Sequence, residues 1–454
     1  MEDAVQPTND GQAGDADPRD KVGYGKPTEN PFLQFGSPHS LSSPSHAVAA
    51  ETEEIYVNPA YRLSAFGFLA SDQPDISGNF GFKDQWTALE WVRDNIAVFG
   101  GNPDDIRISG LSAGAHSVHQ LLHHVARLPA GVGSPFHRAC LQSNAIVTNP
   151  KTPHELRAQY EALLQSLNID PHDKESLSNL KDFKQTPWER ITYEIENNLI
   201  QYGTFRGTSD GSFLPASNAN GNGNNDGEME FQASPEFANK LKEKGVRSII
   251  IGDLTEEWYL YSIAHPIESV KDIEPNLKRY YPDYAVERLL KAFDPLPPNA
   301  SPEECAKLYG RILSDGQGRF ILCCGYFFNI TTNIKQVHLP VRLLHRDLKK
   351  HGFPVLRYEI QWTPPQVRQE GYVTHGTDRS LWAFLTDVLT PDQVPVARLW
   401  LKTINAEIEN IEIKGLNHDI DVILTLKKDC TIGWTKDTRW EEMAKLDRIL
   451  NGQT

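Results

Sequence analysis

The chain has 454 residues, of which 39% are apolar, and this is enough for a large hydrophobic core. Its formal net charge is −15, and an acidic chain without a dense Lys/Arg run argues against nucleic acid or an anionic membrane as a partner. No stretch approaches the roughly 18 consecutive apolar residues that a membrane-spanning helix needs.

The first segment, residues 1–30, is acidic and rich in Gly, Pro, Asp and Asn, so we expect a disordered tail before a single domain over residues 31–454. It lacks the apolar core of a signal peptide, which favours a cytoplasmic location. The 5 cysteines form no C-x-x-C pair, and their odd number argues against a disulfide framework or a structural zinc site.

Hydrophobic periodicity predicts alternating strands and helices along the chain. The first elements in chain order are a strand over residues 55–63, a helix over 84–99 that stops at Gly100-Gly101, a strand over 106–110 and a helix over 113–128. Later strands are predicted at residues 137–142, 248–252 and 355–360, with a flexible Asn/Gly-rich insertion at 216–227 and a helical region over about 265–345. This order predicts a mostly parallel sheet covered on both faces, with reactive groups at the carboxyl ends of its strands.

The stretch Gly110-Leu111-Ser112-Ala113-Gly114 lies where a predicted strand meets a predicted helix. A serine there must turn sharply to expose its hydroxyl, and glycines on either side permit the resulting close approach. The first N–H groups of the following helix point back toward the serine, so the Ala113 N–H is the natural donor to an oxyanion.

A serine hydroxyl needs a base to take its proton, usually a histidine that a carboxylate orients. Carboxylates follow the apolar strand 248–252 in one short loop, and periodicity alone does not choose among Asp253, Glu256 and Glu257.

Several stretches together resemble the type-B carboxylesterase and cholinesterase-like family of α/β-hydrolases. They are residues 61–69 (YRLSAFGFL), 79–85 (NFGFKDQ), 88–92 (ALEWV), 95–103 (NIAVFGGNP), 110–115 (GLSAGA) and 137–143 (HRACLQS). The resemblance implies an α/β-hydrolase fold with a helical insert near the pocket. It also implies a serine carboxylic-ester hydrolase that acts on small-molecule esters through an acyl-enzyme and requires no metal or cofactor.

The resemblance also assigns the remaining site residues. The family's G-x-x-x-D-E pattern lays its catalytic glutamate on Glu257, and its G-x-x-H-G stretch lays the histidine on His375, which gives a Ser112, Glu257 and His375 triad in the family's chain order. Ser143 resembles a serine that the family keeps near the acid, although an ordinary strand-end serine is an equal alternative.

The sequence departs from the family before residue 32. Residues 27–31 (PTENP) stand where the family has a His-Gly-Gly-Gly-like turn that supplies further oxyanion donors, and proline has no N–H to donate. Either the chain is truncated or mis-spliced there, or its oxyanion hole is incomplete. The alternative function is therefore a catalytically impaired relative that acts as a binding or interaction protein. Leu111 replaces a glutamate, and Asn102 replaces an aspartate, which weakens an expected ion pair with Arg62.

Four histidines crowd the helix that follows Ser112: His116, His119, His123 and His124. His119 and His123 have the i, i+4 spacing of metal ligands, but no H-E-x-x-H glutamate accompanies them. We expect ordinary histidines on the helix surface and no metal.

Overall fold

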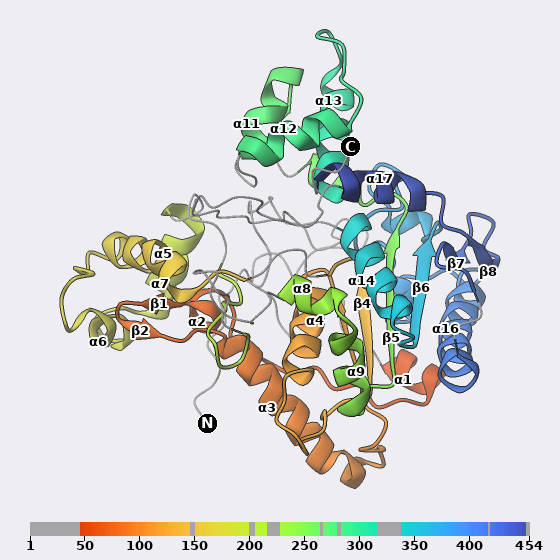
Figure 1. Cartoon of the computed structure of the whole chain (residues 1–454), viewed down its shortest axis with the longest axis horizontal. Helices are drawn as coiled ribbons and strands as arrows, with labels where there is room; N and C mark the ends of the chain where they lie inside the picture. Colours follow the sequence, from red (N-terminus) through yellow and green to blue (C-terminus); the bar gives the residue numbers. More distant parts are fainter. Residues whose placement is uncertain are drawn as a thin grey trace.

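The computed structural model describes residues 46–145, 150–198, 205–215, 228–263, 267–278, 283–315, 337–415 and 418–450. A six-stranded sheet crosses this part of the chain in the order β3-β4-β5-β6-β7-β8 (Figure 1). Its strands are β3 (Arg107–Leu111), β4 (Arg138–Gln142), β5 (Ser248–Leu254), β6 (Val355–Ile360), β7 (Val422–Leu426) and β8 (Ile432–Lys436). Pairing is parallel from β3 to β7 and antiparallel between β7 and β8. The predicted mostly parallel sheet is confirmed.

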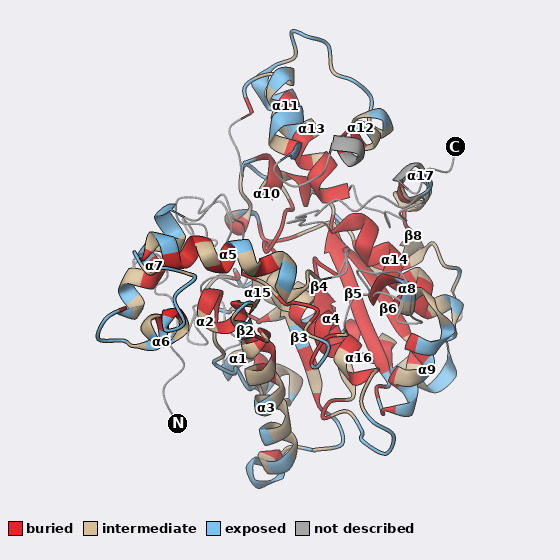
Figure 2. Cartoon of the chain, turned by 60° about the vertical axis from the view of Figure 1, so that its left-hand side comes forward, coloured by how far each residue is buried: buried red, intermediate tan, exposed pale blue. Residues whose placement is uncertain are grey.

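Both faces of the sheet are covered, as Figure 2 shows by the burial of its central strands. Every residue of β5 is buried, and its side chains alternate between two cores. Ile249 and Ile251 join the core under α4 (Ala113–Val125), α9 (Pro235–Glu243) and α14 (His338–Lys350), whereas Ile250 joins the core under α16 (Val394–Lys414). An unbroken apolar run is therefore what a strand sandwiched between helical layers requires.

The helix predicted over residues 84–99 is present and begins earlier, as α3 (Phe80–Asn95) followed by a short 3₁₀ turn (Ile96–Phe99). Gly100 ends it in the left-handed region with φ 86°, which favours glycine. Arg62 does not pair with Asn102, because its guanidinium donates to Asp84 on α3 at 2.8 and 2.7 Å. The expectation that Asn102 weakens an ion pair of Arg62 is therefore wrong.

The strand predicted over residues 55–63 is also wrong. These residues have no regular secondary structure and lead into the short helix α2 (Ser64–Phe68). No described strand lies beside them, and the apolar side chains of Ile55 and Val57 remain 48% and 43% exposed. An apolar run becomes a strand only where a partner and a covering layer exist.

Two groups of helices project away from the sheet in Figure 1. Near its carboxyl end lie α10 (Trp258–Ser262), α11 (Val270–Lys278), α12 (Asp283–Ala292), α13 (Pro302–Asp315) and, from the end of the chain, α17 (Trp440–Leu450). On the other side lie α5 (Pro153–Ser166), α6 (Ser176–Lys181), α7 (Trp188–Asn198) and the hairpin of β1 (Ser71–Asp72) and β2 (Asp75–Ile76). Of the first group, α11, α12 and α13 fall within the helical region expected over about 265–345. The remaining short helices are α1 (His46–Thr52), α8 (Glu228–Ala233), α15 (Arg379–Trp382) and the 3₁₀ turn η3 (Pro365–Val367).

Among the described residues, no helix combines the length and the apolar character needed to cross a bilayer. The expected tail at residues 1–30 and the insertion at residues 216–227 lie outside the described residues, as does the 27–31 stretch.

Candidate active site

Ser112 occupies the turn between β3 and α4, where the sequence predicts it. Its backbone has φ 56° and ψ −115°, a conformation that a residue with a Cβ rarely adopts. The turn is held by the Ser112 N–H, which donates to the Gln142 carbonyl on neighbouring β4 at 2.9 Å. The strained turn places Ser112 directly before the first residue of α4, Ala113, at the carboxyl edge of the sheet.

The two flanking glycines have different roles. A Cβ on Gly110 would lie 2.2 Å from the Gly114 carbonyl carbon, so only glycine permits β3 and α4 to approach this closely. A Cβ on Gly114 would meet nothing within 4 Å. The expected crowding is thus confirmed at Gly110 and wrong at Gly114, which borders open space.

The acid and base candidates meet in the protein interior. Nδ1 of His375 lies 2.7 Å from Oε2 of Glu257, and the two residues are 2% and 0% exposed. The other carboxylate oxygen of Glu257 accepts from the Leu254 N–H at 3.1 Å. Nε2 of His375 has no hydrogen-bond partner in the described part of the chain. With Nδ1 donating to the carboxylate, Nε2 is the nitrogen left to accept a proton.

The other two candidate carboxylates have different partners, and only Glu256 shares the loop of Glu257, because Asp253 lies within β5. Asp253 accepts from Arg342 at 2.9 Å and Arg357 at 2.6 Å, and it also lies 2.8 Å from a ring nitrogen of His338. These cations outweigh the effect of burial and hold the pKa of Asp253 well below its usual value. Glu256 accepts from the Val373 N–H at 2.6 Å, and its own N–H donates to the Val373 carbonyl at 3.0 Å.

The loop that carries His375 lies against the serine turn. A Cβ on Gly376 would lie 3.8 Å from Cδ2 of Leu111, so the neighbours of His375 and Ser112 are in van der Waals range. The Ser112 hydroxyl makes no hydrogen bond to His375 in this structure. Such contacts are often loose without substrate and tighten in the complex.

Ser143 follows β4 with φ 55°, and its N–H donates to the Gly252 carbonyl on β5 at 2.8 Å. Its hydroxyl is buried and has no hydrogen-bond partner among the described residues. It therefore borders the strand from which Glu257 follows but makes no described contact with that carboxylate.

Asp378 is a buried carboxylate near His375 that no sequence motif singled out. Its side chain is 0% exposed, and Oδ2 accepts from the Trp382 indole N–H at 2.9 Å. Burial, with the nearby charge of Glu257, raises the pKa of Asp378 to about 6. Asp378 lies only three residues after the predicted base, and this closeness in sequence could have identified it as a candidate.

The expectation of surface histidines on α4 is wrong for His119 and His123, which are both 0% exposed. Their rings lie 5.1 Å apart, and His123 stacks on Phe237 of α9 at 4.6 Å. Burial lowers the pKa of His119 to about 3, so it stays neutral. No group of His, Cys, Asp and Glu in the described residues is arranged to hold a metal ion.

The chain is similar in sequence to several known proteins. The model of the carboxylesterase family matches residues 32–381. The chain is 27% identical over 446 residues to an uncharacterized esterase/lipase of Schizosaccharomyces pombe, with 93% of this chain and 76% of the relative covered. It is 27% identical over 454 residues to a carboxylic ester hydrolase of Gibberella moniliformis, covering 92% and 75% of the two chains. A para-nitrobenzyl esterase of Bacillus subtilis is 26% identical over 431 residues, covering 88% and 74%.

Proposed function

The chain belongs to the carboxylesterase family, and from this premise we propose that it hydrolyses small-molecule carboxylic esters through an acyl-enzyme on Ser112. In the proposed cycle, the Ser112 Oγ attacks the ester carbonyl while Nε2 of His375 takes the hydroxyl proton. The tetrahedral intermediate collapses, and the alcohol leaves with that proton. Water, deprotonated by His375, then releases the acid and restores the serine.

Glu257 has an orienting role in this proposal. Its carboxylate accepts from Nδ1–H of His375, which fixes the tautomer that leaves Nε2 free and stabilises the imidazolium that forms during attack. The 2.7 Å contact between Glu257 and His375, deep in the protein, is the observation that carries the proposal.

The N-terminus of α4 is the proposed source of oxyanion stabilisation. The Ala113 N–H belongs to the first turn of this 13-residue helix, where N–H groups have no partner in the preceding turn and the helix dipole is positive. Charge that develops on the carbonyl oxygen next to Ser112 would be stabilised there.

A fluorophosphonate probe tests the proposal, because it reacts only with an activated serine. We expect one adduct, mapped by mass spectrometry to Ser112, with labelling lost in Ser112→Ala and strongly reduced in His375→Ala. Ser109→Ala is the matched control, since Ser109 is an exposed serine on β3, the strand that leads into Ser112, and it should label like the parent.

Hydrolysis of p-nitrophenyl acetate gives the second readout and should fall in the same variants. A folded parent protein that neither labels nor hydrolyses the ester, or an adduct on another serine, would contradict the proposal.

A further inference from the structure

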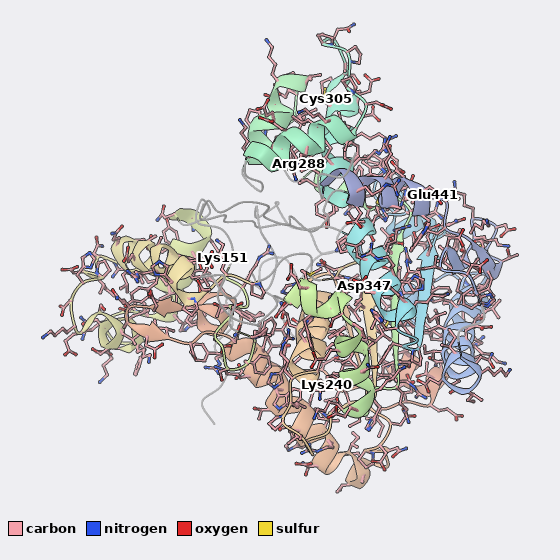
Figure 3. The ribbon with its side chains drawn as sticks, viewed as in Figure 1. Lys151, Lys240, Arg288, Cys305, Asp347 and Glu441 are labelled. Carbon is pink, nitrogen blue, oxygen red and sulfur yellow. The ribbon has the colours of Figure 1, made fainter. Side chains whose placement is uncertain are left out.

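A cavity of about 810 Å³ lies behind the loops that carry the acid and the base. Its walls come from the residues after β5 and β6, from the turn between β7 and β8, and from α13 and the start of α17. Figure 3 labels Cys305 on α13 and Glu441 on α17, the two helices that border it. Ser112, Glu257 and His375 do not line it, so it is distinct from the proposed ester site.

The lining of this cavity is more cationic than anionic, although the whole chain is acidic. Its cationic side chains are Lys307, Arg311, Arg368, Lys428 and Arg439, and its anionic ones are Glu256, Asp315 and Glu442. Five positive charges thus face three negative ones in a chain whose formal net charge is −15. The charge of this cavity is therefore opposite in sign to the net charge of the chain.

Internal ion pairs leave most of the positive charge uncompensated. Arg311 uses two of the carboxylates, Glu442 at 3.1 Å and Asp315 at 3.8 Å. No described carboxylate makes an ion pair with Lys307 or Lys428. The third carboxylate, Glu256, accepts from the Val373 N–H and offsets part of the charge of Arg368, which leaves Lys307, Lys428 and Arg439 without a carboxylate partner among the described residues.

Three of these cations are held in place. Lys307 lies over the Trp258 ring at 5.1 Å from its centroid. The Arg368 guanidinium donates twice to the Thr363 carbonyl, at 2.9 and 2.5 Å. Arg439 donates to the Thr255 carbonyl. Hydrogen bonds to neutral carbonyls fix the two guanidinium groups without neutralising them, so little ordering remains for a ligand to induce.

We infer that this cavity binds a small multivalent oxyanion, of the class of pyrophosphate and other compact phosphate esters. Several cationic groups line one cavity, and carboxylates do not neutralise all of their charge. Such a site stabilises an anion with two or more charges better than a monovalent one. The volume falls within the range of small-molecule sites.

Titration calorimetry with inorganic pyrophosphate, at constant ionic strength set by chloride, tests this inference. We expect saturable binding of one pyrophosphate per chain, and at least a 10-fold weaker affinity in Lys428→Glu. Lys427→Glu is the matched control, because the preceding lysine of the same turn does not line the cavity. It should bind within about twofold of the parent. Lys307→Gln, on the α13 side of the cavity, should also weaken binding.

No saturable binding to the folded parent would overturn the inference, and so would an equal loss in Lys427→Glu, which would show only general attraction to the surface. Phosphatidylcholine vesicles that contain phosphatidic acid form a second arm. Lys428-dependent cosedimentation with them, without binding of free pyrophosphate, would overturn a soluble ligand in favour of a lipid headgroup. Pyrophosphate is bound and not hydrolysed by the ester site, so these results are independent of the proposed esterase activity.

Discussion

At the residue scale, the environment of each side chain separates three carboxylates that the sequence places in one loop. Glu257 contacts the His375 ring, whereas Glu256 contacts only the Val373 backbone. We predict that Glu257→Gln lowers kcat on p-nitrophenyl acetate by about 10³- to 10⁴-fold, because the amide no longer stabilises the imidazolium. Glu256→Gln keeps an acceptor for the Val373 N–H and should lose less than about 10-fold. Equal losses in both variants would remove the distinction.

Asp378 provides a test by pH. Its pKa is raised to about 6 from a usual 3.8, so the folded state holds its proton more tightly than the unfolded state does. The contribution of Asp378 to stability should therefore become less favourable as pH rises from 3.8 to 6, and its full penalty of about 3 kcal/mol should be present above pH 6. Asp378→Asn keeps an acceptor for Trp382 and removes this penalty.

Urea unfolding measures that difference. The variant should gain stability over the parent at pH 7.5 relative to the difference between them at pH 4. A gap that stays constant with pH would show that Asp378 titrates normally.

Residue patterns in the sequence predicted which side chains to consider but not how to choose among them. Periodicity cannot distinguish Asp253, Glu256 and Glu257, because all three come just after the apolar run 248–252. The contacts that separate them come from β6, α14 and the His375 loop. The family pattern chose Glu257, and the contact with His375 supports that choice. Asp378 was overlooked because burial, which shifts its pKa, is not visible in a local motif.

At the scale of elements, the junction of β3 and α4 makes unequal demands on its two glycines. Gly110→Ala would place a Cβ 2.2 Å from backbone that no side-chain rotation can move. We predict a loss of at least about 3 kcal/mol in the free energy of unfolding. Gly114→Ala, in helix α4 with open space at its Cβ, should be neutral or stabilising by up to about 1 kcal/mol. Chemical denaturation compares the two variants, and a tolerated Gly110→Ala would contradict the close approach.

The buried histidines of α4 predict acid sensitivity. The pKa of His119 is about 3 in the folded protein against a usual 6.5. The unfolded state therefore binds the proton first, and stability present above pH 6.5 is lost as pH falls, by about 2 kcal/mol at pH 5. His119→Gln should flatten the dependence of the unfolding midpoint on pH between 6.5 and 5. An unchanged slope would mean that His119 is accessible to protons in the folded state.

Elements were predicted well where local pattern and tertiary burial agree. The bounds of β6 coincide with the predicted residues 355–360, and all six residues are buried although Arg357 and Glu359 interrupt the apolar run. The predicted strand at residues 55–63 fails because strand formation depends on a neighbour that local sequence does not encode. β7 and β8 were not predicted. β8 (IGWTK) is only partly apolar, whereas β7 (VILTL) is as long as β3 and mostly apolar, so its local pattern was an available signal.

At the scale of the whole molecule, Asp253 joins parts of the chain that are distant in sequence. It links β5 to β6 through Arg357 and to α14 through Arg342, whose other nitrogen contacts Asp437 after β8 at 2.7 Å. We predict that Asp253→Asn costs about 3–5 kcal/mol, because it leaves buried guanidinium charge without compensation.

The urea midpoint measures this loss. The matched control, Asp94→Asn, breaks only an exposed pair with Arg93 and should leave the midpoint unchanged. A small effect of Asp253→Asn would mean that water or Asp437 compensates the two arginines. Sequence alone did not predict this network, because its members are scattered from residue 253 to residue 437.

The paired bonds between Glu256 and Val373 have an evolutionary consequence. They join the two loops through Glu256, next to the proposed acid, and Val373, two residues before the proposed base, so this contact does not depend on the Glu257 or His375 side chains. We therefore expect that, under the proposed mechanism, one substitution at residue 257 could abolish turnover during evolution while the fold of these loops is kept. By the same reasoning, a single reversion would restore turnover.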